Sequence, residues 1–211
     1  MLLDDPQQMD EIRRSTQSVY ERQADNWDQI RSTSLYEKPW LDQFLSTLPA
    51  RGRLLDLGCG SGIPVAGYFL AAGHDLVGID YAPTMINLAQ RHYPQAQWHV
   101  QDMTQFHVEG KFDGIYSWDG FFHLSIPQQR HLLPLLSQKV KAGGAILLTV
   151  GTGEGEVTGT VAGETVYHAS LFPEEYQRLL HQYGFENVSY VSEDPEALGR
   201  SIILASQKSC P

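Results

Sequence analysis

The feature that most constrains this chain is a regular alternation of short apolar runs and helix-like segments between residues 53 and 151. Five runs are short enough to be buried strands: residues 53–58, 75–80, 96–100, 112–118 and 143–151. Three segments between them have helical spacing: residues 63–73, 83–92 and 127–140. This alternation predicts an α/β fold, in which a mostly parallel sheet carries helices on both of its faces.

The flanking segments follow other patterns. Residues 9–30 and 39–48 space their apolar side chains as helices do and predict an N-terminal helical lid. A Gly/Thr-rich stretch after the fifth strand predicts an inserted ribbon or loop, and a helix and two further strands predict an antiparallel hairpin at the sheet edge. We therefore expect one domain with a seven-stranded sheet and an antiparallel C-terminal strand. Its four parts are the lid (residues 1–50), the sheet core (51–151), the insertion (152–172) and the terminal helix and hairpin (173–211).

Composition excludes few classes but disfavours some partners. The formal net charge is −10, and the 15 Lys and Arg residues form no cluster, which argues against a nucleic-acid partner. No apolar run is long enough to span a membrane, and the acidic N-terminus does not resemble a signal peptide. Cys59 and Cys210 are far apart in the sequence and predict no disulfide framework, so a cytoplasmic location is expected.

The stretch "LLDLGCGSGIP", residues 54–64, carries glycines at Gly58, Gly60 and Gly62 directly after the first strand. Glycines at such a turn let backbone amides approach a ligand at the start of the next helix. A dinucleotide-binding loop has the spacing G-x-G-x-x-G, but Ile63 stands where its third glycine belongs. The same amides suit the carboxylate of an amino-acid moiety, whose ammonium a nearby carboxylate can hold.

Several motifs in order make a resemblance specific. "LLDLGCGSG" followed by "LVGIDYAPTMINLAQ" resembles the first two motifs of class I S-adenosylmethionine-dependent methyltransferases, and "QDM", "FDGIYSWDGFFHL" and "KAGGAILLT" resemble the later ones. Small bacterial members with "GSGIPVA" and a "YHASLF"-like segment are the most similar branch. The resemblance implies a Rossmann-like fold, S-adenosylmethionine as the cofactor, S-adenosylhomocysteine as its product, and residues 51–151 as the cofactor-binding core.

The cofactor side follows from the strand ends. Asp80 ends the second strand, where its two oxygens suit both ribose hydroxyls, although a helix-capping role is the alternative. Asp102 and Met103 follow the third strand, where the resemblance places adenine; Asp102 capping a turn and Met103 in the core are the alternatives. The full set of predicted cofactor residues is Asp56, Gly58, Cys59, Gly60, Gly62, Asp80, Tyr81, Met85, Asp102, Met103 and Trp118.

The acceptor side is less constrained. His123 follows the fourth strand and is the candidate catalytic residue, with packing or a bond to backbone as the alternative. The segment "YERQADNW", residues 20–27, looks like the family's N-terminal helix, which folds over the cofactor, although ordinary packing is equally compatible. Aromatic and imidazole side chains predict a pocket for a small organic acceptor: Trp27, Phe121, Phe122, Tyr167, His168 and the neighbouring Phe172.

Other readings stay open at this point. "SWDGFF" differs from the "NPPY" or "DPPY" of enzymes that methylate the exocyclic amines of bases, and the eight histidines show no metal-ligand spacing, so no metal is expected. The favoured function is methyl transfer to a small organic acceptor by in-line displacement, in a monomer or homodimer. A protein that binds the cofactor without catalysis, or a nicotinamide-dependent oxidoreductase, is the alternative.

Overall fold

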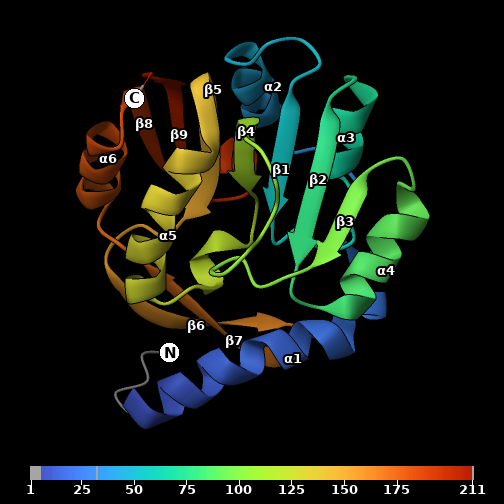
Figure 1. The fold of residues 1–211 in the computed structure, drawn as a ribbon. Coiled ribbons are helices and arrows are strands. Elements are labelled where there is room, and N and C mark those ends of the chain that lie inside the picture. The colour runs from blue at the N-terminus through green and yellow to red at the C-terminus, as the bar shows by residue number, and fades with distance from the viewer. Residues whose placement is uncertain (1–5, 32, 211) are drawn as a thin grey trace.

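The computed structural model describes residues 6–31 and 33–210 as an α/β domain (Figure 1). Its main sheet has seven strands in the order β3-β2-β1-β4-β5-β9-β8. All pairings from β3 to β5 are parallel, whereas β9 is antiparallel to both of its neighbours. The strands are β1 (Arg53–Leu57), β2 (Asp75–Asp80), β3 (Gln97–Val100), β4 (Phe112–Ser117), β5 (Val140–Val150), β8 (Phe185–Asp194) and β9 (Arg200–Lys208). The predicted sheet and its antiparallel C-terminal strand are confirmed.

Helices cover both faces of this sheet, as the sequence predicts. α2 (Lys38–Ser46), α3 (Val65–Ala71) and α4 (Pro83–His92) pack on one face, where Phe44 and Phe69 meet strand residues such as Leu54. α5 (Ile126–Lys139) and α6 (Pro173–Gln182) pack on the other face, against the alternate strand residues such as Leu55. Successive strand side chains point to opposite faces, so each strand contributes to both cores. The helix α2 therefore belongs to a core layer and not to the expected lid.

The helix α1 (Pro6–Ile30) takes the lid position alone. It runs across the carboxyl ends of the strands and packs on α4 and on a two-stranded antiparallel sheet made of β6 (Gly155–Val161) and β7 (Glu164–Ser170) (Figure 1). This second sheet is the ribbon expected in the insertion. Val19 of α1 packs against Val161 and Val166 of the ribbon, and Ala24 packs against α4.

Polar contacts tie α1 to both supports. The Glu21 carboxylate accepts hydrogen bonds from the backbone N–H of Thr84, at 3.0 Å, and from its hydroxyl, at 2.6 Å. On the ribbon side, Gln23 donates to the carboxylate of Glu164 at 2.7 Å.

Short 3-10 turns complete the chain as η1 (Phe121–His123) and η2 (Pro195–Ala197). None of the helices within residues 6–31 and 33–210 has the length and apolarity needed to cross a membrane.

Candidate active site

A cavity of about 440 Å³ lies at the carboxyl ends of β1, β2 and β4, with α1 across it. The sheet order places β1 beside β4, and the chain reverses its direction of winding at that pair. Open α/β sheets bind ligands at such a switch point, because the loops that leave the two strands diverge to opposite faces. The volume lies within the range of about 300–1,000 Å³ that is usual for small-molecule sites.

The glycine loop forms the wall that follows β1. Gly58 and Gly62 have φ values of +72° and +80°, which L side chains rarely adopt. A Cβ at Gly58 would lie 3.0 Å from the Met103 methyl carbon, and one at Gly62 would lie 3.2 Å from Trp98. At Gly60 a Cβ would meet the Met85 sulfur at 4.0 Å and no nearer atom. Gly58 and Gly62 therefore need glycine for conformation and packing, whereas Gly60, with a φ of +53°, needs it for conformation and leaves space open beside the cavity.

Most amides of this loop already have partners in the protein. The N–H groups of Gly58 and Cys59 donate to the Ile79 carbonyl, at 2.9 and 3.0 Å, and that of Gly62 donates to the Cys59 carbonyl at 3.0 Å. The N–H of Gly60 donates to Asp80 at 2.9 Å. Three of these amides hold the loop against β2, and that of Gly62 closes a turn within the loop. Direct binding of a ligand by the loop amides stays a prediction, and these four N–H groups already have partners.

Asp80 connects the loop to the end of β2. Its Oδ2 accepts from the Gly60 N–H, and its Oδ1 accepts from the Ala82 N–H at 2.9 Å. Burial raises the pKa of the Asp80 carboxyl, while the two backbone bonds oppose that shift. The helix-capping alternative is not realised, because Ala82 is the N-cap residue of α4 and the bond from its N–H to Asp80 closes a turn ahead of that helix. The Asp80 side chain also lines the cavity. Asp80 thus organises the loop and still offers lone pairs to a ligand.

Asp56 lies deeper in the same wall. Its carboxyl is 4% exposed and accepts a hydrogen bond from the Tyr116 hydroxyl at 2.8 Å. Burial raises its pKa to about 8, so the isolated site holds this group largely neutral near pH 7. A cation in the cavity would favour the ionised form, which makes Asp56 a suitable partner for an ammonium group.

The wall that follows β3 is formed by Asp102 and Met103. Asp102 Oδ1 accepts from the N–H and the hydroxyl of Thr104, both at 2.7 Å, so the turn-capping alternative is real. The structure brings every predicted cofactor residue to the lining of this one cavity: Asp56, Gly58, Cys59, Gly60, Gly62, Asp80, Tyr81, Met85, Asp102, Met103 and Trp118. Their individual roles toward a ligand stay predictions.

The predicted acceptor pocket is corrected in part. Trp27 and His123 line the cavity, but Phe121, Phe122, Tyr167 and His168 do not. The turn η1 sends its side chains in different directions: Phe121 is fully buried in the core, and Phe122 packs on the ring of His168 behind His123. Tyr167, on strand β7 of the ribbon, is buried against α1, and Phe172 is 51% exposed.

His123 has a partner on each ring nitrogen. Nδ1 lies 2.8 Å from the Tyr167 carbonyl oxygen, and Nε2 lies 2.8 Å from the Tyr20 hydroxyl. Burial, together with the nearby His168, lowers the pKa of His123 to about 4, so the ring is neutral at physiological pH. The predicted alternative of a bond to backbone is present, but so is a side-chain partner that itself lines the cavity.

The cavity has further lining residues, and the sequence indicated only some of them. Tyr20 and Gln17 project from α1, and Asp119 and Gly120 follow β4. Asp119 has a φ of +59° and forms two 2.7 Å contacts with the Arg200 guanidinium. A Cβ at Gly120 would lie 2.9 Å from the Leu57 carbonyl oxygen, so glycine is required where this turn approaches β1. Tyr20 begins the "YERQADNW" segment that was expected to fold over the cofactor, and Asp119 follows Trp118 at the end of the fourth strand. Gln17 had no signal beyond its helix, and the glycine in "SWDGFF" was the available signal for Gly120.

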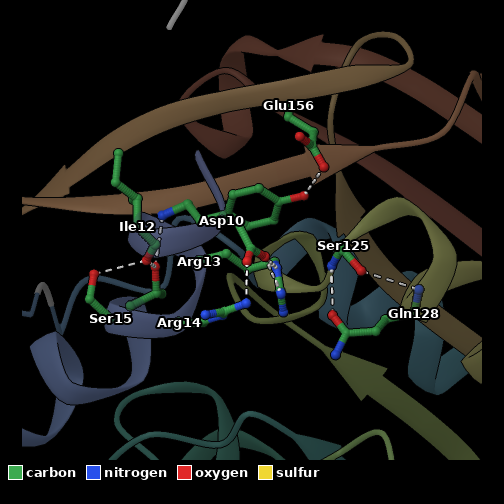
Figure 2. A network of polar contacts seen from close by, with 10 residues as sticks. Asp10, Ile12, Arg13, Arg14, Ser15, Ser125, Gln128 and Glu156 are labelled. Atoms are coloured by element: carbon green, nitrogen blue, oxygen red, sulfur yellow. Dashed lines mark hydrogen bonds and ion pairs between the residues drawn. The ribbon is translucent and has the colours of Figure 1, made fainter. Parts of the chain in front are cut away.

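The mouth of the cavity carries charge near the start of α1. Figure 2 shows Asp10 between Arg13 and Arg14, close to the Ser125–Gln128 pair at the N-terminus of α5. Ser125 and Gln128 form a capping box that satisfies the first amides of that helix. The two guanidinium groups share the Asp10 carboxylate, and the Glu156 carboxylate lies in the same network, so charges of both signs meet here.

Comparison with known proteins identifies the family. A family model described as a methyltransferase domain matches residues 27–190. The chain belongs to this methyltransferase domain family. The predicted family resemblance and fold are thereby confirmed, since solved structures with bound S-adenosylmethionine or its product share the architecture.

Two curated relatives match the methyltransferase domain over part of their length. A putative methyltransferase, YqeM, of Bacillus subtilis (strain 168) is 30% identical over 101 residues, covering 46% of this chain and 40% of the relative. Ubiquinone biosynthesis O-methyltransferase of Xanthomonas axonopodis pv. citri (strain 306) is 27% identical over 107 residues, covering 48% of this chain and 44% of the relative. The matched stretches thus span less than half of each relative.

Solved structures match over nearly the whole methyltransferase domain. CalS10, an amino pentose methyltransferase of Micromonospora echinaspora with bound S-adenosylmethionine, has a TM-score of 0.67 at 21% identity, covering 90% of this chain and 96% of that chain. The 1,6-didemethyltoxoflavin-N1-methyltransferase of Burkholderia thailandensis, with bound S-adenosylhomocysteine, has a TM-score of 0.67 at 18% identity. This match covers 99% of this chain and 93% of that chain. At these identities the likeness shows the fold.

Proposed function

We propose that this chain transfers the methyl group of S-adenosylmethionine to a small organic acceptor. The observation that carries the proposal is one cavity with two sources of lining residues: the strand ends and the loops after them supply Asp56, Asp80 and Asp102, and α1 and η1 supply Tyr20, Trp27 and His123. We call the first set of residues the cofactor half and the second the acceptor half. The family membership of the chain and the bound S-adenosylmethionine in CalS10 support the same reading.

In the cofactor half the chemistry of the donors and acceptors fits the molecule. Asp80 would accept from the two ribose hydroxyls, Asp102 from the exocyclic amine of adenine, and Asp56 from the ammonium. Met85 and Met103 line the same space and would cover the faces of the adenine ring. The open space at Gly60 lets the ligand approach the loop backbone.

When bound, S-adenosylmethionine supplies an electrophilic methyl carbon, whose bond to sulfur breaks as the acceptor's electron pair forms the new bond, leaving a neutral thioether. The protein has to align the acceptor and exclude water, and alignment of this kind can contribute about 7–11 kcal/mol. The helix α1 meets both needs, because Tyr20 and Trp27 lie on the side of it that faces the cavity.

The nature of the acceptor follows from size and charge. The cavity is small, and the net charge of −10 disfavours a polyanion. The acceptors named for two similar structures, an amino pentose and 1,6-didemethyltoxoflavin, are small molecules, which supports a small acceptor here. We propose that the protein acts in the cytoplasm as a monomer or homodimer and needs no metal. Within residues 6–31 and 33–210, no group of three or more His, Cys, Asp and Glu side chains is placed to hold a metal ion.

Two titrations and a screen test this function. Calorimetry with S-adenosylhomocysteine should show binding at one site, and NADH should give no heat of binding. Incubation with methyl-labelled S-adenosylmethionine and a panel of small amines, alcohols and thiols should then transfer label. NADH binding without S-adenosylhomocysteine binding would favour the oxidoreductase, and cofactor binding without transfer to any acceptor would favour a non-catalytic binding protein.

A further inference from the structure

Three segments that are distant in the sequence meet in one chain of hydrogen bonds beside the cavity. The Tyr167 carbonyl of β7 lies 2.8 Å from His123 Nδ1 in η1, and His123 Nε2 lies 2.8 Å from the Tyr20 hydroxyl of α1. Tyr167 is fixed in turn, because its N–H donates to the Thr16 hydroxyl at 2.8 Å and its own hydroxyl donates to Glu156 at 2.6 Å. The Tyr20 end of the chain of bonds reaches the cavity lining.

The Tyr167 carbonyl, at one end of this chain of hydrogen bonds, determines the position of each proton in it. A carbonyl oxygen can only accept, so His123 Nδ1 must carry a hydrogen. Because burial keeps the ring neutral, Nε2 has no hydrogen and must accept the one from the Tyr20 hydroxyl. The single hydroxyl proton of Tyr20 is therefore committed to His123.

The consequence appears at the Tyr20 oxygen. With its proton committed, this oxygen can offer only lone pairs to a molecule in the cavity. Burial and the negative charges of Asp119 and Asp80 raise the pKa of Tyr20, so the phenol stays protonated. The same charges disfavour an anionic group at this position, whereas an N–H or O–H group finds a fixed acceptor.

An acceptor with an N–H group and one with an O–H group differ in where their proton goes during methyl transfer. A hydroxyl acceptor has to lose its proton as the methyl bond forms, but His123 is weakly basic here, and Asp119 is occupied by two contacts with Arg200. A neutral amine can react through its nitrogen lone pair and keep its proton until the product ammonium reaches water. The arrangement of groups around Tyr20 therefore favours nitrogen.

We propose that Tyr20 determines acceptor specificity: its hydroxyl oxygen, held by His123, accepts a hydrogen bond from the N–H of a neutral amine. This inference rests on the proposed function and narrows it to a class of acceptor. Tyr20 is the residue that touches the acceptor, and His123 is a positioning residue that acts through Tyr20.

Nitrogen-15 NMR of the imidazole rings tests the chain of bonds without any acceptor. The His123 signals should show the Nδ1–H tautomer and stay unchanged from about pH 8 to about pH 5.5. His181 provides an internal reference, because its Nδ1 also lies near a backbone carbonyl, that of Phe185 at 2.9 Å, and it is outside the cavity lining. An Nε2–H tautomer at His123, or its protonation within that pH range, would overturn the proposal.

Ligand-observed NMR on the protein saturated with S-adenosylhomocysteine tests the class of acceptor. The probes are aniline, N-methylaniline, N,N-dimethylaniline and benzoate, which share a ring and differ in the donor. The two probes with an N–H should bind about fivefold more tightly than the dimethyl analogue, as one hydrogen bond allows. Y20F should abolish this difference, and H123N should weaken it because the Tyr20 proton becomes free to turn into the cavity.

Matched controls separate this inference from the function on which it rests. Y190F removes a hydroxyl that lies 3.4 Å from the Gly151 carbonyl oxygen, and H181N removes the reference imidazole. Neither residue lines the cavity, so both variants should keep the wild-type preference for probes with an N–H. If wild-type protein fails to bind S-adenosylhomocysteine, the proposed function fails. If it binds with unchanged affinity in Y20F but no probe shows an N–H preference that depends on Tyr20, the present proposal fails alone.

Discussion

The cofactor half and the acceptor half of the cavity are held together in different ways. In the cofactor half, bonds stay within one turn or join neighbouring strands: Asp80 bonds to Ala82 two residues away and to Gly60 on the adjacent loop. In the acceptor half, Tyr20 and His123 are 103 residues apart, and Thr16 and Tyr167 are 151 apart. The parallel sheet fixes the first half, whereas the second exists only when α1 docks on α4 and the ribbon.

This difference teaches how the two halves can vary. A substitution on α1 or the ribbon can reshape the acceptor half while the β1–β2 contacts of the cofactor half stay in place. A substitution among those contacts should instead affect cofactor binding whatever the acceptor is. The following predictions test this separation, from the largest expected effect to the smallest.

The largest effect is expected for Asp80→Asn. The amide keeps one accepting oxygen but turns an NH₂ group toward a backbone N–H, so the loop loses a partner and the ribose loses a charged acceptor. Hydrogen bonds to charged groups contribute about 1.5–3 kcal/mol each, so affinity for S-adenosylhomocysteine should fall about 100-fold or more. Calorimetry measures the loss, and Asp75→Asn at the exposed start of β2 is the control. Affinity within twofold of wild type would remove Asp80 from the cofactor half.

Asp56→Asn should change the pH dependence of stability. Burial raises the pKa of Asp56 to about 8 in the folded protein, above the unfolded value of about 3.9. The stability that the neutral carboxyl contributes is complete below about pH 4 and is lost as pH rises through about 8. The variant should therefore be more stable than wild type at about pH 8, on the order of 2–4 kcal/mol, and close to it at about pH 4.

Urea unfolding across that pH range, without cofactor, measures the effect of Asp56→Asn. Asp25→Asn, at an exposed position of α1, is the matched control and should follow the wild-type profile. If the stability difference between wild type and Asp56→Asn does not change with pH, Asp56 is not held neutral, and its proposed response to an ammonium group loses its basis.

Gly58→Ala should have a smaller effect in the same half. The residue has a φ of +72°, and a Cβ there would press on the Met103 methyl at 3.0 Å. The left-handed conformation costs an L residue about 1–2 kcal/mol, and the free loop of the variant can avoid this cost by relaxing to another conformation. Binding must then restore the left-handed conformation, so affinity for S-adenosylhomocysteine should fall about 10-fold. At Gly153 a Cβ has no atom within 4 Å, so Gly153→Ala should bind as wild type does. Equal affinities for the two variants would show that the loop tolerates a side chain at Gly58.

The smallest effect is expected where α1 docks. Thr84→Ala removes a 2.6 Å hydrogen bond to Glu21 and leaves the backbone bond of the same residue in place. Stability should fall by about 1 kcal/mol, and hydrogen exchange of the α1 amides should accelerate while exchange in β1 does not. Ser18→Ala, which removes an exposed local bond on α1, is the control. Equal acceleration in β1 would mean that the two halves are not independent.

The separation also explains which parts the sequence predicts. Gly58, Asp80 and Asp102 each lie at the end of a strand, and parallel strands bring their carboxyl ends to one edge, so local patterns were enough to predict that they meet. The direction of the side chains in η1 was not predictable, because one tight turn sends Phe121 into the core and His123 to the cavity. The segment that begins at Tyr20 was expected to fold over the cofactor, but its bond to His123 was not predictable, since helical spacing shows that α1 is amphipathic and not which side chain each residue contacts.

A crystal structure of the complex with S-adenosylhomocysteine tests the division of the cavity into a cofactor half and an acceptor half. We expect the adenosine between Asp80 and Asp102, the amino-acid end toward Asp56, and the sulfur on the side of the cavity that Tyr20 lines. A ligand bound outside this cavity, or one whose sulfur lies by Asp102 with adenine beside Tyr20, would contradict the division into a cofactor half and an acceptor half.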